Sequence, residues 1–295
     1  MKDFSGTGVA IITPFTITGE VDYDALCSLV EAYIESGIDF LVVLGTTAET
    51  VTLSQEEQIK VTRKVAEVNA GRLPLMLGKG GNNTYALVDD LKTTDFSGYS
   101  AILSVCPYYN RPNQEGIYQH FSAVAQASPL PVMLYNVPAR TGASIENDTV
   151  IRLAQVHDNI IGIKDATGDV NAGKALIEAL PNDFLVSSGE DLTALDLVSQ
   201  GGAGAISVIA GAFPKEFSKM IELARKEDLS TAKQIEKDLL PFIDLIFREG
   251  NPTGLKALLA LQGKSENFLR LPLVPASQML QEQIKAQLET LTTKC

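Results

Sequence analysis

The chain is poor in the residues that build metal centres and disulfide frameworks. Its 295 residues include no tryptophan, two histidines and three cysteines. His120 and His157 are too few for a multi-histidine metal site, and they disfavour a Ser-His-Asp triad. Cys27, Cys106 and Cys295 are odd in number and far apart, so they indicate neither a disulfide framework nor a structural zinc site. We therefore expect no metal site.

Basic charge and long apolar runs are also scarce. Lys and Arg number 24 against 36 Asp and Glu, which gives a net charge of −12 with neutral histidine. The sequence has no basic cluster of the kind that neutralises nucleic-acid phosphates. No apolar run reaches the ~18 residues of a membrane-spanning helix, and residues 1–4 (MKDF) carry no signal-peptide apolar segment. We expect a cytoplasmic protein with no nucleic-acid or membrane partner.

Hydrophobic residues make up 45% of the chain, enough for a full core, and many lie in eight short apolar runs. Such runs, rich in Val, Ile and Leu, are typical of strands buried on both faces of a parallel sheet. Their starts are about 28 residues apart, the length of a strand, a helix and two loops. The runs cover residues 8–15, 39–45, 73–78, 100–107, 131–138, 160–166, 184–189 and 204–210.

The segments between the runs have a helical period. Apolar residues between positions 25 and 34 repeat at the three-and-four spacing of one helix face, with Asp22 or Asp24 as the candidate cap. Ser54 and Glu57 form a capping-box pattern for the next helix. Eight alternating units favour a closed (β/α)8 TIM barrel over an open doubly wound sheet. We predict a barrel over residues 1–225 and a C-terminal helical region over 226–295, with helices at 230–247, 253–261 and 276–291.

One lysine interrupts a strand that otherwise belongs to the core. Lys164 follows the apolar residues 160–163, and a buried ammonium is costly unless it is paired or neutralised. Desolvation disfavours the charged form and leaves a nucleophilic amine, which can form a Schiff base with a ketone or aldehyde. The alternative is a strand-end lysine that forms an ion pair with Asp165 or Glu190.

Other polar residues follow the predicted strands at the same end, where barrel enzymes place their active sites. Tyr135 could relay protons or fill the core with its hydroxyl on a backbone carbonyl. Thr46 and Thr47 could bind a carboxylate or cap a helix, and Arg140 could grip a carboxylate or lie in solvent. His120 and Cys106, and the glycine-rich residues 78–82, fit structural roles; residues 78–82 match neither a P-loop nor a dinucleotide fingerprint.

These residues resemble the pyruvate-dependent aldolase and lyase family that contains dihydrodipicolinate synthase and N-acetylneuraminate lyase. The resemblance covers nearly the whole chain, and its six matching segments occur in order, each at a predicted strand end. They are residues 45–49 (GTTAE), 107–112 (PYYNRP), 135–142 (YNVPARTG), 163–168 (IKDATG), 188–189 (SG) and 204–207 (GAIS).

The resemblance implies a role for each matching residue. Lys164 corresponds to the lysine that condenses with pyruvate, and Tyr135 to the tyrosine that shuttles its protons. Thr47 and Tyr109 correspond to the rest of a proton relay, with Thr46 beside it and Tyr109 contributed across a dimer interface. Backbone positions lining the pyruvate pocket correspond to Gly189 and Ile206, and the arginine that binds the second substrate's carboxylate corresponds to Arg140.

The setting of Arg140 in residues 138–142 (PARTG) favours the dihydrodipicolinate synthase branch over the sugar-acid lyases. The resemblance then implies condensation of pyruvate with aspartate semialdehyde to hydroxytetrahydrodipicolinate, with no cofactor, in a homotetramer that is a dimer of dimers. Two alternatives are a sibling aldolase that acts on a sugar acid and a keto-acid sensor without turnover. The sensor is disfavoured because every relay residue is present.

The chain departs from the family pattern at several positions. Ala48 replaces a usual glycine, and Lys79 stands where threonine is common. Lys79 adds a cation near the active end, which could aid acidic substrates or lie outside the site. Inhibited relatives bind lysine at the dimer interface, and Asn82 and Tyr108 match two of its ligands. However, Ala86 occupies the position of the glutamate that receives the lysine ammonium, and Gln55 and Gln58 replace histidines of some members. Loss of one charge-assisted hydrogen bond costs about 2 kcal/mol, roughly thirtyfold in affinity. We expect weak or absent lysine inhibition.

Overall fold

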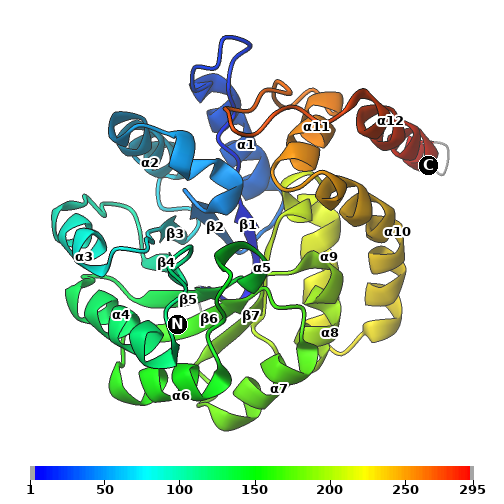
Figure 1. Ribbon diagram of the computed structural model, residues 1–295. Coiled ribbons are helices and arrows are strands. Elements are labelled where there is room, and N and C mark those ends of the chain that lie inside the picture. Colours follow the sequence, from blue (N-terminus) through cyan, green and yellow to red (C-terminus); the bar gives the residue numbers. More distant parts are fainter. Residues whose placement is uncertain (1–3, 293–295) are drawn as a thin grey trace.

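Eight parallel strands close into a barrel, and the helices between them form an outer ring (Figure 1). The structure is a computed structural model that describes residues 4–292, so Cys295 lies outside the described residues. Each strand pairs with the next, and β8 closes the ring on β1. The strands are β1 (Gly6–Ala10), β2 (Phe40–Val43), β3 (Leu75–Gly78), β4 (Ala101–Val105), β5 (Val132–Asn136), β6 (Ile160–Asp165), β7 (Leu185–Ser188) and β8 (Gly204–Ser207).

The predicted barrel is therefore confirmed, with one strand displaced along the sequence. β1 starts two residues before the first apolar run and ends at Ala10. The following apolar residues Ile11, Ile12 and Phe15 leave the sheet but remain buried against the outer helices. Apolar character therefore extended beyond the strand because the loop after β1 is itself part of the core.

Helices follow the strands in the predicted order. Asp22 caps α1 by accepting a hydrogen bond from the Ala25 amide, and the capping box of Ser54 and Glu57 opens α2. The barrel helices are α1 (Tyr23–Glu35), α2 (Gln55–Asn69), α3 (Thr84–Thr93), α4 (Gln114–Ala127), α5 (Pro138–Thr141), α6 (Asn147–Val156), α7 (Val170–Ala179), α8 (Ala194–Ser199) and α9 (Pro214–Arg225). Short 3-10 turns are η2 (Thr46–Ala48), η3 (Thr50–Thr52), η4 (Asp191–Thr193) and η5 (Ile209–Gly211).

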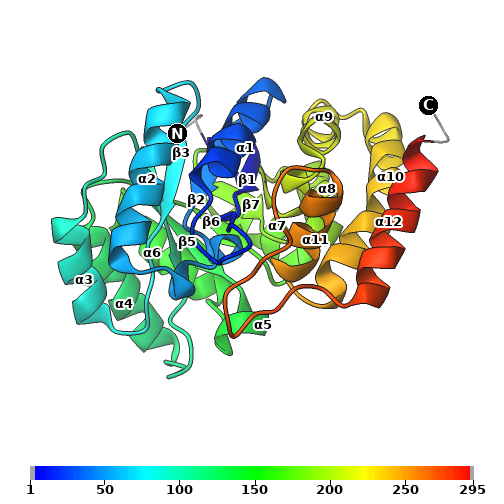
Figure 2. The same cartoon turned by 90° about the horizontal axis from the view of Figure 1, so that it is seen from above.

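The C-terminal region consists of α10 (Leu229–Arg248), α11 (Thr253–Leu261) and α12 (Gln278–Thr292), close to the predicted ranges. Figure 2 shows these helices on one side of the barrel, where α10 packs on α9. Apolar side chains of α10 and α11, such as Phe242 and Leu255, belong to the same cluster as Val9 of β1. Helix α9 ends at Arg225, which is the predicted boundary between the barrel and the C-terminal region. The division into two domains stays a prediction.

Cys106 and the glycine-rich residues 78–82 have the structural roles that the sequence predicts. Cys106 is fully buried, and burial raises the pKa of its thiol to about 12, so it is an inert core residue. The backbone of the glycine-rich segment passes close to its neighbours, because a Cβ at Gly78 would lie 2.1 Å from the Leu44 carbonyl oxygen. None of the described helices is long and apolar enough to cross a membrane.

His120 makes the fold sensitive to acid. Its ring is buried in α4, with Nδ1 2.9 Å from the Thr84 hydroxyl, and burial lowers its pKa from 6.5 to about 4. The unfolded chain therefore takes up a proton before the folded one does as the pH falls from 6.5 to 4, and stability is lost over that window. The shift corresponds to about 3 kcal/mol.

We predict that His120→Gln flattens the pH dependence of stability between pH 6.5 and 4, because an amide does not titrate there. The measurement is the free energy of unfolding in urea at several pH values. His157→Gln is the matched control, because it makes the same change at the other histidine, whose Nε2 lies 3.0 Å from the hydroxyl of Ser122 on α4. Equal slopes for wild type and His120→Gln would contradict the assignment.

Candidate active site

Lys164 lies inside the barrel near the C-terminal end of β6. It is in register with Tyr135 on β5 and Ser187 on β7, so the three side chains project from the same face of the sheet. The lysine is 5% exposed, and its Nζ lies 4.4 Å from the centre of the Tyr135 ring. Among residues 4–292, no carboxylate lies within ion-pair distance of Nζ. The ion pair with Asp165 or Glu190 that the sequence left open is therefore absent.

The neighbouring carboxylate is engaged elsewhere. Asp165 accepts hydrogen bonds from the Asn136 amide at 3.1 Å and the Thr167 hydroxyl at 2.7 Å. Burial raises the pKa of this carboxyl above its ordinary value, against the lowering effect of those two bonds. Lys164 is thus a buried amine next to a phenol, with no counter-ion in the described part of the chain, and this arrangement suits a Schiff-base nucleophile.

Gly189 and Ile206 shape the space around the lysine. A Cβ at Gly189 would lie 2.8 Å from Lys164 Cε, so a larger residue would displace the lysine side chain. Ile206 is fully buried on β8, in the cluster that fills the barrel with Tyr135. The turn after β8 is held by Asp191, which accepts bonds from the amides of Val208 and Ile209; burial raises the pKa of Asp191 to about 6.

The threonine pair forms a 3-10 turn directly after β2. The N-cap residues of η2, η3 and α2 are Gly45, Glu49 and Ser54, so neither threonine caps a helix. Thr46 is exposed toward a cavity, whereas Thr47 is 2% exposed and its hydroxyl accepts a bond from Asn251 Nδ2 at 3.0 Å. The left-handed backbone falls on Glu49 (φ 53°) and not on Ala48, so the replacement of glycine by Ala48 is not strained.

A cavity of about 450 Å³ opens at the C-terminal end of strands β2–β5, and Tyr135 lines it whereas Lys164 does not. Arg140, Lys79 and Asp90 are also among the residues that line it. Arg140 projects from α5 and donates a bond to the Asn251 carbonyl oxygen at 3.1 Å. Lys79 forms an ion pair with Asp90 at 2.7 Å, so its charge is compensated within the chain. The cavity also contacts Thr46, Val51, Gln58, Tyr108 and Val137.

Of the residues that the resemblance places at a dimer interface, Tyr108 lines this cavity, whereas Tyr109, Asn82 and Ala86 do not. Tyr109 is 90% exposed and does not line the cavity. Asn82 donates a bond to the Tyr108 carbonyl oxygen at 3.0 Å, so the two candidate effector ligands are adjacent. Ala86 is exposed on α3 and carries no polar atom in its side chain. The lysine site and its weak effect stay predictions.

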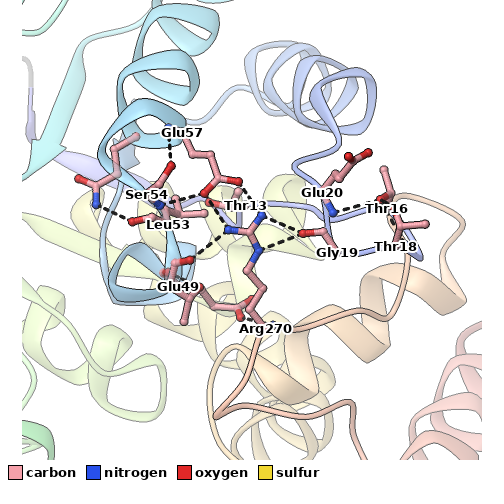
Figure 3. A network of polar contacts seen from close by, with 12 residues as sticks. Thr13, Thr16, Thr18, Gly19, Glu20, Glu49, Leu53, Ser54, Glu57 and Arg270 are labelled. Carbon is pink, nitrogen blue, oxygen red and sulfur yellow. Dashed lines mark hydrogen bonds and ion pairs between the residues drawn. The ribbon is translucent and has the colours of Figure 1, made fainter.

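A buried ionic cluster behind the threonine pair was not anticipated. Glu49 and Lys256 form a fully buried ion pair at 2.5 Å, and the Arg270 amide donates to the same carboxylate at 3.1 Å. The Arg270 guanidinium binds Glu57 with two bonds and the carbonyl oxygen of Gly19 (Figure 3). Asn251, Lys256 and Arg270 lie 200 residues or more from Thr47, Glu49 and Glu57, in a segment without a motif, so no local pattern marked them.

Burial and the ion pair with Glu49 shift the pKa of Lys256 in opposite directions. Burial lowers the pKa of its ammonium to about 8, although Glu49 raises it. The ammonium also donates to the Phe268 carbonyl oxygen at 3.0 Å and lies 4.1 Å from the centre of the Phe15 ring. The cluster thus connects the C-terminal segment to the loop after β2 and to the loop after β1.

A closed parallel barrel with a buried, unpaired lysine at the C-terminal end of its sixth strand defines a class of Schiff-base-forming barrel. A family model described as "Dihydrodipicolinate synthetase family" matches residues 3–291, and the chain belongs to that family.

Relatives extend over the whole chain. The 4-hydroxy-tetrahydrodipicolinate synthase of Flavobacterium psychrophilum is 50% identical over 96% of this chain and 97% of its own length. That of Parabacteroides distasonis is 46% identical over 99% of each. The solved structure from Methylacidiphilum fumariolicum SolV superposes with a TM-score of 0.95 at 40% identity, over 99% of this chain and 97% of its own. A chloride-inhibited relative from Acinetobacter baumannii, solved with pyruvate, gives 0.93 at 43%, over 97% and 98%.

We predict that Lys256→Met destabilises the fold by about 3–5 kcal/mol, because it leaves the Glu49 carboxylate buried without its counter-ion. The double variant Lys256→Met/Glu49→Gln should recover part of that loss, as measured by urea unfolding. Lys60→Met is the control, because it breaks an exposed pair with Glu56 and should change stability little. A single variant as stable as the double variant would contradict the role of the pair.

Proposed function

We propose that the chain is a lyase that condenses pyruvate with L-aspartate 4-semialdehyde to 4-hydroxy-tetrahydrodipicolinate, a step of lysine and diaminopimelate biosynthesis. One observation carries the proposal: Lys164 is a buried amine against the ring of Tyr135, which lines an open cavity, and no carboxylate of residues 4–292 pairs with it. Relatives that share up to 50% of their residues with this chain bear the name of this synthase. The location we propose is the cytoplasm.

The chemistry begins at the Lys164 amine. Nζ adds to the keto carbon of pyruvate, and loss of water gives an iminium. The iminium accepts the electron pair of a methyl C–H bond, so a proton leaves and an enamine forms. The enamine carbon then forms a bond to the aldehyde carbon of the second substrate, whose oxygen takes up a proton. Finally the amino group of that substrate adds to the imine carbon, closes the ring and releases the Lys164 amine.

Side chains around the lysine would move the protons and hold the substrates. We assign the proton shuttle at the imine to Tyr135, and the relay beyond it to Thr47 and Tyr109, with Thr46 beside them. We place the pyruvate against the backbone at Gly189 and Ile206. Arg140 faces the cavity from α5 and is assigned to the carboxylate of aspartate semialdehyde. The proposed steps require no metal or organic cofactor.

The second candidate is a sibling aldolase that cleaves a sugar acid such as N-acetylneuraminate. Arg140 argues for the synthase, because its guanidinium lines the cavity and is positioned by a backbone carbonyl. Turnover of aspartate semialdehyde compared with N-acetylneuraminate distinguishes the two.

We predict that borohydride added with pyruvate reduces the imine and attaches the pyruvate carbon skeleton covalently to Lys164. Mass spectrometry of the digested protein should place the added mass on the peptide that contains this residue. Lys164→Ala should abolish the adduct and lower turnover by roughly a thousandfold or more. Lys60→Ala is a control for the adduct, since it removes an exposed lysine that does not line the cavity. The absence of any adduct on wild type would eliminate the Schiff-base mechanism.

We further propose that the active molecule is a homotetramer built as a dimer of dimers, in which Tyr109 completes the site of a second copy. The Tyr109 side chain is 90% exposed, and those of Val51 (90%), which lines the cavity, and Tyr85 (85%) on α3 are exposed to a similar extent. Large exposed apolar side chains favour association of subunits where they form a common surface.

We predict that Tyr109→Phe and Lys164→Ala subunits, each nearly inactive, recover partial activity when mixed under conditions of subunit exchange. In a mixed dimer, one of the two sites would hold both Lys164 and Tyr109, so at most about half of its sites can be active. Exchange is verified by native mass spectrometry. If exchange takes place and no activity returns, Tyr109 does not act across the interface.

A further inference from the structure

The loop after β2 forms one wall of the cavity that Tyr135 and Arg140 also line. Five residues of the loop contact the cavity, and Glu49, which lies between them in the sequence, does not. The five are Leu44, Gly45, Thr46, Thr50 and Val51. The conformation of this loop therefore determines the shape of the cavity on that side.

Two residues of the loop have a backbone conformation that residues other than glycine rarely adopt. Leu44 has a φ of 56° and Glu49 a φ of 53°, both in the left-handed region. They lie on either side of the 3-10 turn η2. Such a conformation costs free energy and persists only where the surrounding groups fix it. The turn between the two residues is therefore expected to relax if either of them is released.

Leu44 is fixed by the barrel. Its carbonyl group packs against Gly78 at the end of β3, where a Cβ would lie 2.1 Å from the Leu44 oxygen and 2.7 Å from its carbon. The strand β3 is paired with β2 and β4 on its two sides, so it cannot shift without them. The first of the two strained residues is thus held without any contribution from the C-terminal region.

Glu49 is fixed by the C-terminal region instead. Its carboxylate forms the buried ion pair with Lys256 of α11 and accepts a hydrogen bond from the Arg270 amide at 3.1 Å (Figure 3 shows the Arg270 contact). Lys256 is itself held by the Phe268 carbonyl oxygen at 3.0 Å. Because the Glu49 side chain does not line the cavity, it can affect a molecule bound there only through the backbone of the loop.

We propose that Glu49 is a positioning residue for the second substrate: held by Lys256 and Arg270, it keeps the strained loop after β2 in the conformation that admits aspartate semialdehyde beside Arg140. The inference rests on the proposed function and adds to it a part for the C-terminal region, which sets the shape of the cavity. It leaves the reaction of pyruvate at Lys164 unaffected, because Lys164 does not line this cavity.

Glu49→Gly is the discriminating variant. Glycine adopts a φ of 53° without strain, so the substitution permits the native backbone and removes only the contacts that select it. If the competent loop conformation is then populated about one-tenth of the time, KM for aspartate semialdehyde rises about tenfold. We expect kcat at saturating substrate to stay within about threefold, because the bound substrate itself selects the competent conformation.

Pyruvate provides the readout that a general loss of structure would also change. The rate at which the borohydride-trapped pyruvate adduct forms on Lys164 should stay within about twofold of wild type in Glu49→Gly, because the wall that moves does not contact Lys164. A rise in KM for one substrate with an unchanged adduct rate for the other separates positioning from damage to the whole barrel.

A second variant guards against poor folding of the first. Glu49→Gly leaves the Lys256 ammonium buried without its counter-ion, which destabilises a fold. The double variant Glu49→Gly/Lys256→Met removes both charges together with the contact, and we expect the same rise in KM from it. Folding of both variants at the assay temperature is checked by circular dichroism.

Glu57→Gln is the matched control within the same cluster. It breaks the ion pair with the Arg270 guanidinium, whereas glutamine at this position keeps the capping-box pattern that opens α2. Lys256 and the Arg270 amide remain on Glu49. The KM values of this variant for both substrates should stay within about twofold of wild type, because the exposed side of the cluster does not fix the strained residue.

Three outcomes overturn the proposal. Folded Glu49→Gly and its double variant could keep the wild-type KM for aspartate semialdehyde, their pyruvate adduct rate could fall as far as KM rises, or Glu57→Gln could raise KM as much as they do. Wild-type protein that forms the pyruvate adduct and does not turn over aspartate semialdehyde would overturn the proposed function instead.

Discussion

The burial of the Lys164 amine is the constraint on which the rest of the structure depends, and no carboxylate of residues 4–292 lies within ion-pair distance of it. Burying such a group is costly unless its neighbours accommodate it. The absence of a side chain at Gly189 leaves room for the lysine, and the Tyr135 ring centre lies 4.4 Å from its nitrogen. The barrel thus holds one amine in a fixed place next to a phenol, where it can form a bond to a carbonyl carbon.

The C-terminal helices are part of the same construction. Their apolar residues share a core with the outer face of the first strands, and their polar residues reach the loop after β2 through Asn251 and Lys256. Buried polar contacts of this kind fix one arrangement of the backbone, because each group that moves loses a partner that water cannot replace. The C-terminal helices, which follow β8, therefore help to fix the position of the loop after β2.

Prediction from the sequence succeeded where the signal was local and repeated. Eight apolar runs at even spacing favoured a closed parallel barrel over an open sheet, and Ser54 with Glu57 marked a helix start within four residues. It failed at the end of β1, since apolar residues that pack under a loop look like apolar residues in a strand. It also left Lys79 undecided, because its partner Asp90 lies on a different element and only packing brings the two together.

By itself, the sequence determined the barrel, the lysine at the end of its sixth strand and the polar residues that follow the other strands. Each of these is encoded by the order of residues along a short segment, where periodicity and strand ends are visible. Only the tertiary structure decided that no carboxylate of residues 4–292 pairs with Lys164, and that Asn251 contacts Thr47 across 204 positions of the chain. Contacts between distant segments depend on how the ring of strands closes, and no local pattern carries that information.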